Sequence, residues 1–315
     1  MIDKIKRAQG CLIGAAAGDA LGMPSEYISK AQLNQFYDGK ITQFQKPLSN
    51  HPCRHLQKGQ YTDDTQRLIV LAESLISCHG FDVNDFGRRV GEWAFKCMTI
   101  PHYDRFAGTT SIMAGLKLYD RKRPDQTGGS APTCGSAMGI APLGVFYHQQ
   151  IDALNNMARV NSKVTHRHPA AIDAALLVSH LVAYFMNGLS VEQALQQTRT
   201  RLTSDLVYNL DFITLNKERQ PAEMAVILGA SEKAHEAVPL ALHCFLHSPD
   251  NYEQTIINAA NLVSGDTDSI ACIAGALSGA YNGIDTIPKK FKEGLEDVNL
   301  LGDLAARLIQ TSPTN

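Results

Sequence analysis

Apolar side chains recur three and four residues apart through most of this sequence, and this spacing restricts the chain to helical folds. Leu68, Leu71, Ala72, Leu75 and Ile76 would lie on one face of such a helix. Alternating runs of β-branched residues, which are typical of strands, are hard to find. The pattern therefore predicts an all-α fold. The expected helices cover residues 66–77, 170–186, 191–202, 238–246, 252–263 and 270–281.

Polar residues mark the expected starts of two of these helices. Ser190 is followed three residues later by Gln193, and Asp250 by Glu253. This is the spacing of a capping box, in which each of the two side chains binds the backbone N–H of the other residue. We therefore expect Ser190 and Asp250 to be N-cap residues.

The 315 residues leave room for one large domain or two ordinary ones, because a domain usually has about 100–200 residues. The irregular segments, residues 34–60 and 120–133, do not separate regions of different composition, so we interpret them as loops of a single domain over residues 1–315. Residues 310–315 are expected to form a frayed tail.

The charge balance gives little reason to expect a polymeric partner. There are 29 Lys and Arg residues against 31 Asp and Glu residues, so no net positive field would attract nucleic acid or an anionic membrane. The apolar stretch at residues 11–18 is too short to span a bilayer. The seven cysteines are scattered singly, as is typical of reduced thiols. We therefore expect a cytoplasmic protein with no membrane or nucleic-acid partner.

Two short acidic clusters, Thr62–Thr65 and Asp266–Ser269, each come directly before an apolar helix. Helix capping explains one oxygen-bearing side chain in each cluster, but each supplies at least three in succession. An all-oxygen set suits Mg²⁺ or Mn²⁺ better than Zn²⁺. If the two helix starts converge, they would hold a pair of divalent cations, whose charge would keep the four carboxylates ionised. Capping alone remains the alternative for each cluster.

Several motifs in a fixed order resemble those of the ADP-ribosylglycohydrolase family. The resemblance extends from residue 10 to residue 288 and is specific because the motifs occur in the family's order. They are Gly14–Glu26 (G-x-x-x-G-D-A-L-G-x-P-x-E), Tyr61–Gln66 (with T-D-D-T), Gly135–Gly144, Thr165–Pro169 and Gly265–Ala271 followed by Ala274–Ala276.

The resemblance implies a fold, a cofactor and a set of site residues. The fold would be a compact single-domain orthogonal helical bundle with a central binuclear site for Mg²⁺ or Mn²⁺. The metal ligands would be Thr62, Asp63, Asp64, Asp266, Asp268 and Ser269. Glu26 and Asp64 would act in catalysis. The residues implied in substrate binding are Cys134, Gly135, Ser136, Met138 and His166.

The implied activity is hydrolysis of the bond between ADP-ribose and an acceptor, with release of ADP-ribose. The acceptor would be a protein side chain, such as arginine or serine, or a small conjugate, and the enzyme would be a monomer. Two alternatives stay open. One is a family member without activity that binds ADP-ribose or is structural, and the other is a metal-dependent phosphohydrolase of nucleotide diphosphates.

Two positions depart from the family pattern. Cys134 stands where many members have Asn, and Gly139 where many have Arg. A guanidinium group can bind phosphate through two hydrogen bonds, whereas glycine has no side chain. We therefore expect diphosphate recognition to depend on backbone N–H groups or on other residues.

Overall fold

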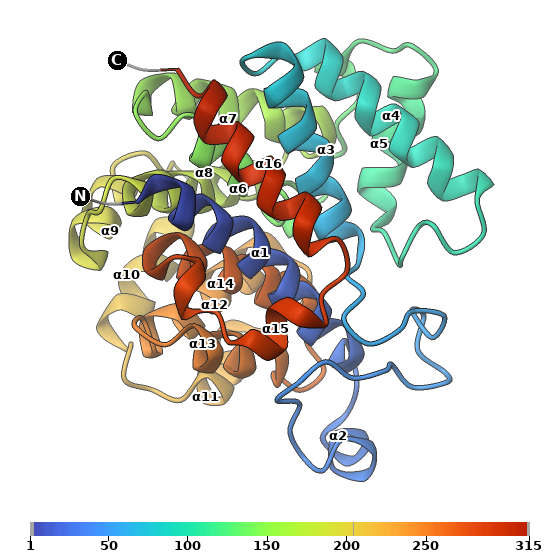
Figure 1. The fold of residues 1–315 in the computed structure, drawn as a ribbon, viewed down its shortest axis with the longest axis vertical. Coiled ribbons are helices and arrows are strands. Elements are labelled where there is room, and N and C mark those ends of the chain that lie inside the picture. Colours follow the sequence, from blue (N-terminus) through green and yellow to red (C-terminus); the bar gives the residue numbers. More distant parts are fainter. Residues whose placement is uncertain (1–2, 204, 314–315) are drawn as a thin grey trace.

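The computed structural model describes residues 3–203 and 205–313, and within these ranges it contains helices and no strand (Figure 1). This confirms the predicted all-α, single-domain fold. The α-helices are α1 (Lys4–Gly22), α2 (Lys30–Phe36), α3 (Asp63–Cys78), α4 (Val83–Thr99), α5 (Thr109–Tyr119), α6 (Ala141–Phe146), α7 (Ile151–Thr165), α8 (Pro169–Met186), α9 (Val191–Arg199), α10 (Leu206–Leu215), α11 (Pro221–Leu228), α12 (Ala234–His247), α13 (Tyr252–Ala260), α14 (Thr267–Asn282), α15 (Lys289–Glu293) and α16 (Val298–Thr311).

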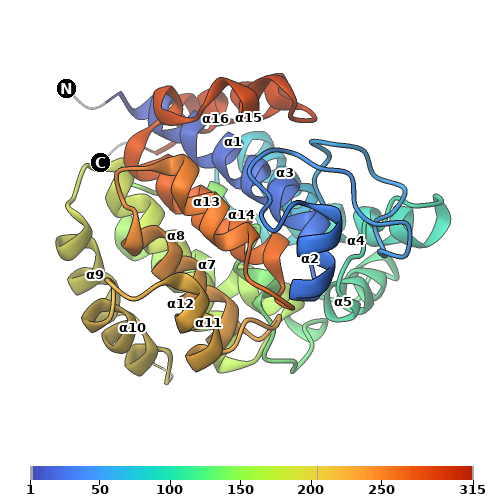
Figure 2. The same ribbon diagram turned by 90° about the horizontal axis from the view of Figure 1, so that it is seen from below.

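Helices α1 and α14 lie in close contact at the centre of the fold, and Figure 2 shows α1 between α14 and α16. Glycine occurs at every fourth position of α1 from Gly10 to Gly22, on the side of the helix that faces α14. A Cβ atom added to Gly14 would lie 2.6 Å from the carbonyl oxygen of Gly275 on α14. The two backbones can therefore approach this closely only because these side chains are absent.

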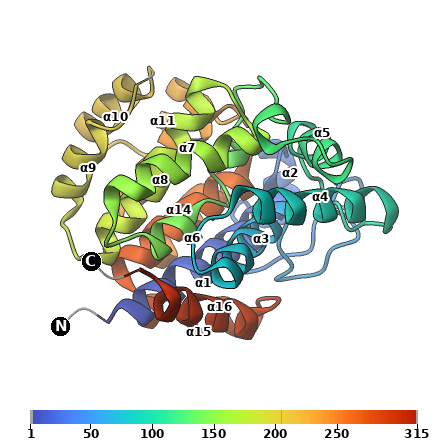
Figure 3. The same ribbon diagram turned by 90° about the horizontal axis from the view of Figure 1, so that it is seen from above.

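Helix α8 is the second central element. It is long and apolar enough to cross a membrane by length and composition, but 89% of this span is buried inside the protein. It packs against α6, α7, α12 and α14 (Figure 3). Its hydrophobicity on all sides is therefore that of a core helix.

The predicted helices are confirmed, with corrections at their ends. Helix α9 ends at Arg199 and α13 at Ala260, each three residues before the predicted end. The capping box of Ser190 with Gln193 is present. The predicted N-cap at Asp250 is wrong. Helix α13 starts at Tyr252, as predicted, but its N-cap is Asn251, whose side chain accepts a hydrogen bond from the backbone N–H of Gln254.

The C-terminal prediction was partly wrong. Helix α16 continues through Thr311, so residues 310 and 311 are helical and do not belong to a frayed tail. The buried side chain of Leu308 explains this, because α16 packs against α1, α3 and α6 and its last turns are held by these contacts. Residues 314 and 315 of the predicted tail lie outside the described residues.

Candidate metal and substrate site

The first turns of α3 and α14 meet beside the C-terminal end of α1 and bring the two acidic clusters into one cavity of about 350 Å³. The clusters are 202 residues apart in the sequence, so their convergence depends entirely on the tertiary fold. Most of the residues predicted for the site line this cavity. They are Glu26, Asp63, Asp64, Gly135, Met138, His166, Asp266, Asp268 and Ser269.

The cavity collects five buried carboxyl groups. Glu26, Asp266 and Asp268 each offer an oxygen atom that lies within 4.8 Å of the other two, and Asp63 and Asp64 face the same cavity from α3. Burial raises the pKa of Glu26 well above its ordinary value, and the charges of the neighbouring aspartates, first Asp268 and then Asp266, raise it further. So many carboxylates can remain ionised together only beside compensating positive charge.

The donor set fits a divalent cation. Three carboxylate oxygens are buried without a hydrogen-bond donor from any described residue: Glu26 Oε2, Asp63 Oδ2 and Asp64 Oδ1. A buried acceptor without a partner is destabilising by about 1–3 kcal/mol, so the arrangement indicates a missing positive partner. Oxygen ligands without thiolate or imidazole are those that Mg²⁺ and Mn²⁺ prefer.

Asp19 on α1 supports the start of α3, a role that was not expected from the sequence. Its carboxylate accepts hydrogen bonds from Thr62 N at 2.9 Å, from Thr65 N at 3.1 Å and from Thr65 Oγ1 at 2.6 Å. Burial and the charge of Asp268 raise the pKa of Asp19 to about 7, against the opposing effect of these hydrogen bonds. An aspartate within an apolar Ala/Gly helix was the available signal, because such a residue is rarely buried without partners.

Three of the predicted site residues, Thr62, Cys134 and Ser136, do not line the cavity. Thr62 is the N-cap of α3, and its Oγ1 donates to Asp64 Oδ2 at 3.1 Å. The Cys134 thiol donates to Asp266 Oδ2 at 3.4 Å, and the Ser136 hydroxyl donates to the carbonyl oxygen of Ala171 at 3.2 Å. Thr62 and Cys134 therefore position carboxylates of the cavity through hydrogen bonds. The Ser136 hydroxyl instead forms its hydrogen bond with the backbone of α8 in the core.

Close packing against α3 explains why position 139 is a glycine in this chain. A Cβ atom at this position would lie 3.0 Å from the backbone nitrogen of Leu68 and 3.1 Å from the Cβ atom of Arg67, so α3 leaves little space for a side chain. Arg67 itself is buried beside the cavity, 5.2 Å over the ring of Trp93. Its charge lowers the pKa of Asp63, against the larger raising effects of burial and Asp268. A guanidinium group is therefore present near the site, but it belongs to Arg67 on α3 and not to position 139.

His166 lines the cavity as a neutral side chain. Burial, with a smaller effect from the charge of Arg67, lowers its pKa to about 3. Its ring stands against Gly135, where an added Cβ atom would lie 2.8 Å from His166 Cε1, and its Nδ1 is 2.9 Å from the Thr165 hydroxyl. A neutral imidazole can offer its second ring nitrogen to a ligand as a donor or an acceptor.

Two further walls of the cavity were not predicted from the sequence. Tyr27 and Phe106 line the cavity, although their side chains are 45% and 42% exposed, and both have positive φ angles, of 53° and 69°. Such backbone angles are uncommon for bulky residues and cluster at functional sites. The first turn of α5 also lines the cavity and has no side-chain cap, so its backbone N–H groups are free for an anion.

The chain is similar in sequence to the proteins of one family. The sequence model of the family described as ADP-ribosylglycohydrolase matches residues 1–315. An uncharacterised protein of Archaeoglobus fulgidus is 32% identical over 308 residues, covering 97% of this chain and 96% of that protein. Human ADP-ribosylhydrolase ARH3 is 27% identical, covering 98% of this chain and 95% of the relative.

Two more similarities agree with this family. The ADP-ribosylarginine hydrolase Tri1 of Serratia proteamaculans is 25% identical, covering 99% of this chain and 81% of the relative. Among solved structures, an "ADP-ribosylglycohydrolase-related protein complex" superposes with a TM-score of 0.81 at 25% identity, covering 98% of this chain and 99% of that one. The helical fold is therefore shared along nearly the whole chain.

Proposed function

Because the chain belongs to the ADP-ribosylglycohydrolase family, we propose that it hydrolyses the glycosidic bond between ADP-ribose and an acceptor and releases free ADP-ribose. The acceptor would be a protein side chain, such as arginine or serine, or a small conjugate. The observation that carries this proposal is the cavity with five buried carboxyl groups, three of which have an oxygen without a hydrogen-bond donor among the described residues. The aspartates that we propose as metal ligands, at least one of which an inactive member would lack, are all present.

The cavity would hold two divalent cations, Mg²⁺ or Mn²⁺. Asp63 and Asp64 would bind them from α3, and Asp266, Asp268 and Ser269 from α14, with Thr62 holding Asp64 in place. When bound, such cations supply positive charge that orients ribose hydroxyls and makes water a better nucleophile.

Two carboxyl groups of the chain would carry out the proton transfers of the reaction. Glycoside hydrolysis needs one carboxyl group that donates a proton to the leaving acceptor and a second that accepts a proton from water. Glu26 suits the first role because burial and the neighbouring aspartates raise its pKa and so favour its protonated form. Asp64 would take the second role, since a bound cation beside it would favour its ionised form. Water adds to the anomeric carbon while the bond from this carbon to the acceptor atom breaks.

The walls of the cavity would bind the rest of the substrate. The uncapped N-terminus of α5 would accept the diphosphate through its backbone N–H groups, as the absence of an arginine at position 139 leads us to expect. Gly135, Met138 and His166, which also line the cavity, would contact the substrate as well. Cys134 would act through its hydrogen bond to Asp266.

The test is to supply arginine-linked and serine-linked ADP-ribosyl peptides and O-acetyl-ADP-ribose, with Mg²⁺ or with EDTA, and to measure free ADP-ribose by chromatography. We expect release with Mg²⁺ only, and a loss of more than about 100-fold in the variant Asp268→Asn. Asp303→Asn is a matched control, because Asp303 is exposed on α16.

Three results would contradict the proposal. Full activity of Asp268→Asn would refute the metal site. Release of phosphate would favour a nucleotide-diphosphate phosphohydrolase. Binding of ADP-ribose without turnover of any conjugate would favour a family member without activity.

A further inference from the structure

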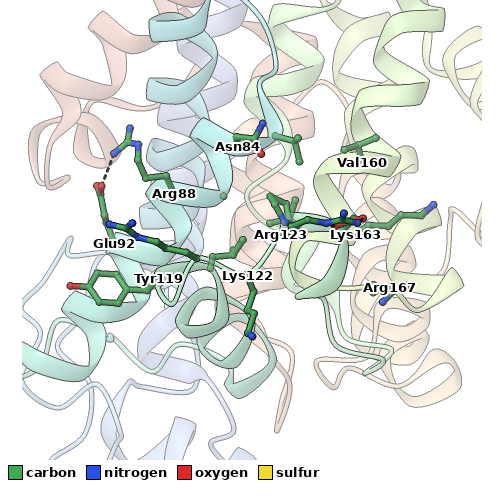
Figure 4. Close-up of a pocket in the computed structure, with 16 residues that line it drawn as sticks. Asn84, Arg88, Glu92, Tyr119, Lys122, Arg123, Val160, Lys163 and Arg167 are labelled. Atoms are coloured by element: carbon green, nitrogen blue, oxygen red, sulfur yellow. Dashed lines mark hydrogen bonds and ion pairs between the residues drawn. The ribbon is translucent and has the colours of Figure 1, made fainter.

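A second cavity, much larger than the catalytic one, lies between α4, the C-terminal end of α5 and α7. Its volume is about 1100 Å³, and Figure 4 shows the charged side chains around it. We refer to it as the basic groove. Six cationic side chains line it, against the carboxylates of Glu92 and Asp125. The six are Arg88, Arg121, Lys122, Arg123, Lys163 and Arg167.

Most of these cations are not neutralised within the protein. Arg88 forms an ion pair with Glu92 at 2.6 Å and Arg123 with Asp125 at 2.5 Å. The other four, at positions 121, 122, 163 and 167, form no ion pair with any residue of the described ranges 3–203 and 205–313. In a chain of net charge −2, such a concentration of free positive charge on one surface indicates an anionic partner.

The floor of the basic groove is apolar. Between the cations it is lined by the partly exposed side chains of Val83, Tyr119, Pro124 and Val160, with Leu118 and Val164 buried beneath them. Val160 is 39% exposed and Tyr119 is 44% exposed, so this surface is open to solvent. A nucleic acid would offer phosphates to the rim but no aliphatic groups to the floor. An acidic peptide segment with apolar side chains would match both parts.

The basic groove shares two walls with the catalytic cavity. The first turn of α5, including Thr110, lines the catalytic cavity, while Leu118 and Tyr119 at its other end line the groove. Nine residues of α-helix span about 14 Å. His166 lines the catalytic cavity and its neighbour Arg167 lines the groove. A ligand in the groove would therefore lie close to one in the catalytic cavity.

We propose that the basic groove binds an acidic, partly apolar segment of the ADP-ribosylated protein, so that the natural substrate is protein-linked. This inference rests on the proposed function and adds a docking site to it. An extended chain rises about 3.3 Å per residue, so about 14 Å corresponds to four or five residues. The acidic residues should therefore begin about five residues from the modified side chain.

The first experiment measures binding alone. The probe is a fluorescein-labelled 15-residue peptide of Glu and Leu, followed by fluorescence anisotropy at low ionic strength. The double variant Lys122→Glu/Lys163→Glu should weaken its binding at least about tenfold. Lys40→Glu/Lys217→Glu is the matched control, because it makes the same change in net charge at exposed lysines outside the groove and should bind the probe nearly as the wild type does.

The second experiment measures hydrolysis of two ADP-ribosylated peptides, one with four glutamates starting five residues from the modified side chain and one with glutamines in their place. The groove variant should raise KM about tenfold for the acidic peptide only, with kcat unchanged. Equal effects of both double variants, or tighter binding of duplex DNA than of the probe, would overturn the proposal. Probe binding that depends on the groove, without turnover of any conjugate, would support the groove and contradict the proposed function.

Discussion

Asp19 shows how one side chain can position a site that it does not line. It lies on α1, while the groups that donate to it, Thr62 N and Thr65 N, belong to the start of α3. Its carboxylate therefore fixes the direction in which Asp63 and Asp64 enter the cavity. Such partners, 43 and 46 residues away in the sequence, cannot be inferred from local patterns. The clusters themselves could be predicted, because capping leaves their extra oxygens unexplained.

We predict that Asp19→Ala weakens cation binding as well as the fold. Removal of the carboxylate leaves three buried donor groups without their acceptor, which should destabilise the protein by about 2–4 kcal/mol. The start of α3 would shift, and the affinity for Mn²⁺ should fall about 10–100-fold, as for other groups that orient metal ligands. Urea unfolding and calorimetric titration with Mn²⁺ measure the two effects.

Asp82→Ala provides the matched control for Asp19→Ala. Asp82 also caps a helix, because it accepts hydrogen bonds from Asn84 N and Asp85 N at the start of α4, but it is not among the residues that line the cavity. Its removal should lower the free energy of unfolding by about 1 kcal/mol and leave Mn²⁺ affinity unchanged. Equal losses of affinity in both variants would refute a specific role of Asp19.

At the scale of elements, the close contact of α1 and α14 places the first turn of α14 beside the C-terminal end of α1, at the proposed metal site. The contact ends at Gly22 and Thr267, next to Asp268 in the first turn of α14. The sequence predicted a helix at 270–281, and many of its residues are Ala, Gly or Ser, which permit close approach of another backbone. It did not identify α1 as the partner, because a helix surface of small residues is compatible with any similarly small surface.

We predict that Gly18→Ala destabilises the protein by about 3 kcal/mol, because the new Cβ atom would overlap the carbonyl oxygen of Ala271 and push the two helices apart. Mn²⁺ affinity should fall as well, since the aspartates on α3 and α14 would separate. Urea unfolding and calorimetry measure these effects. In Gly302→Ala on α16 the nearest atoms would lie 3.9 Å away, so this control should be neutral or stabilise by up to about 1 kcal/mol. A stable Gly18→Ala protein would contradict the packing argument.

At the same scale, helices were easier to predict than their ends. The apolar spacing of Leu68 to Ile76 is a local property, and it places α3 within three residues at its start. The apolar spacing does not fix where a helix stops, since α9 ends at Arg199, three residues before the predicted end, and the spacing of Asp250 and Glu253 did not identify Asn251 as the N-cap of α13. The basic groove could not be predicted, because Arg88, Lys122 and Lys163 come from three separate parts of the chain.

At the scale of the whole molecule, buried histidines should make stability depend on pH. His148, His180 and His243 each use one ring nitrogen to bind a backbone carbonyl oxygen, at 2.8, 2.9 and 2.9 Å. Burial lowers the pKa of all three, and that of His180 to about 4. The folded protein therefore keeps these histidines neutral at pH values at which the same histidines are already protonated in the unfolded chain.

The sign of the effect comes from this difference in proton binding. Between pH 6.5 and about 4 the unfolded chain binds more protons at position 180 than the folded protein does, so stability falls as the pH falls through this range. At pH 5 the loss from His180 alone should be about 2 kcal/mol relative to pH 7. We predict that His180→Gln, which cannot be protonated, removes this part of the pH dependence. Urea unfolding of both proteins at pH 7 and pH 5 in EDTA measures it, since the carboxylate cluster is the same in both and cancels in the comparison. An equal loss between pH 7 and pH 5 in the two proteins would show that His180 does not contribute to acid sensitivity.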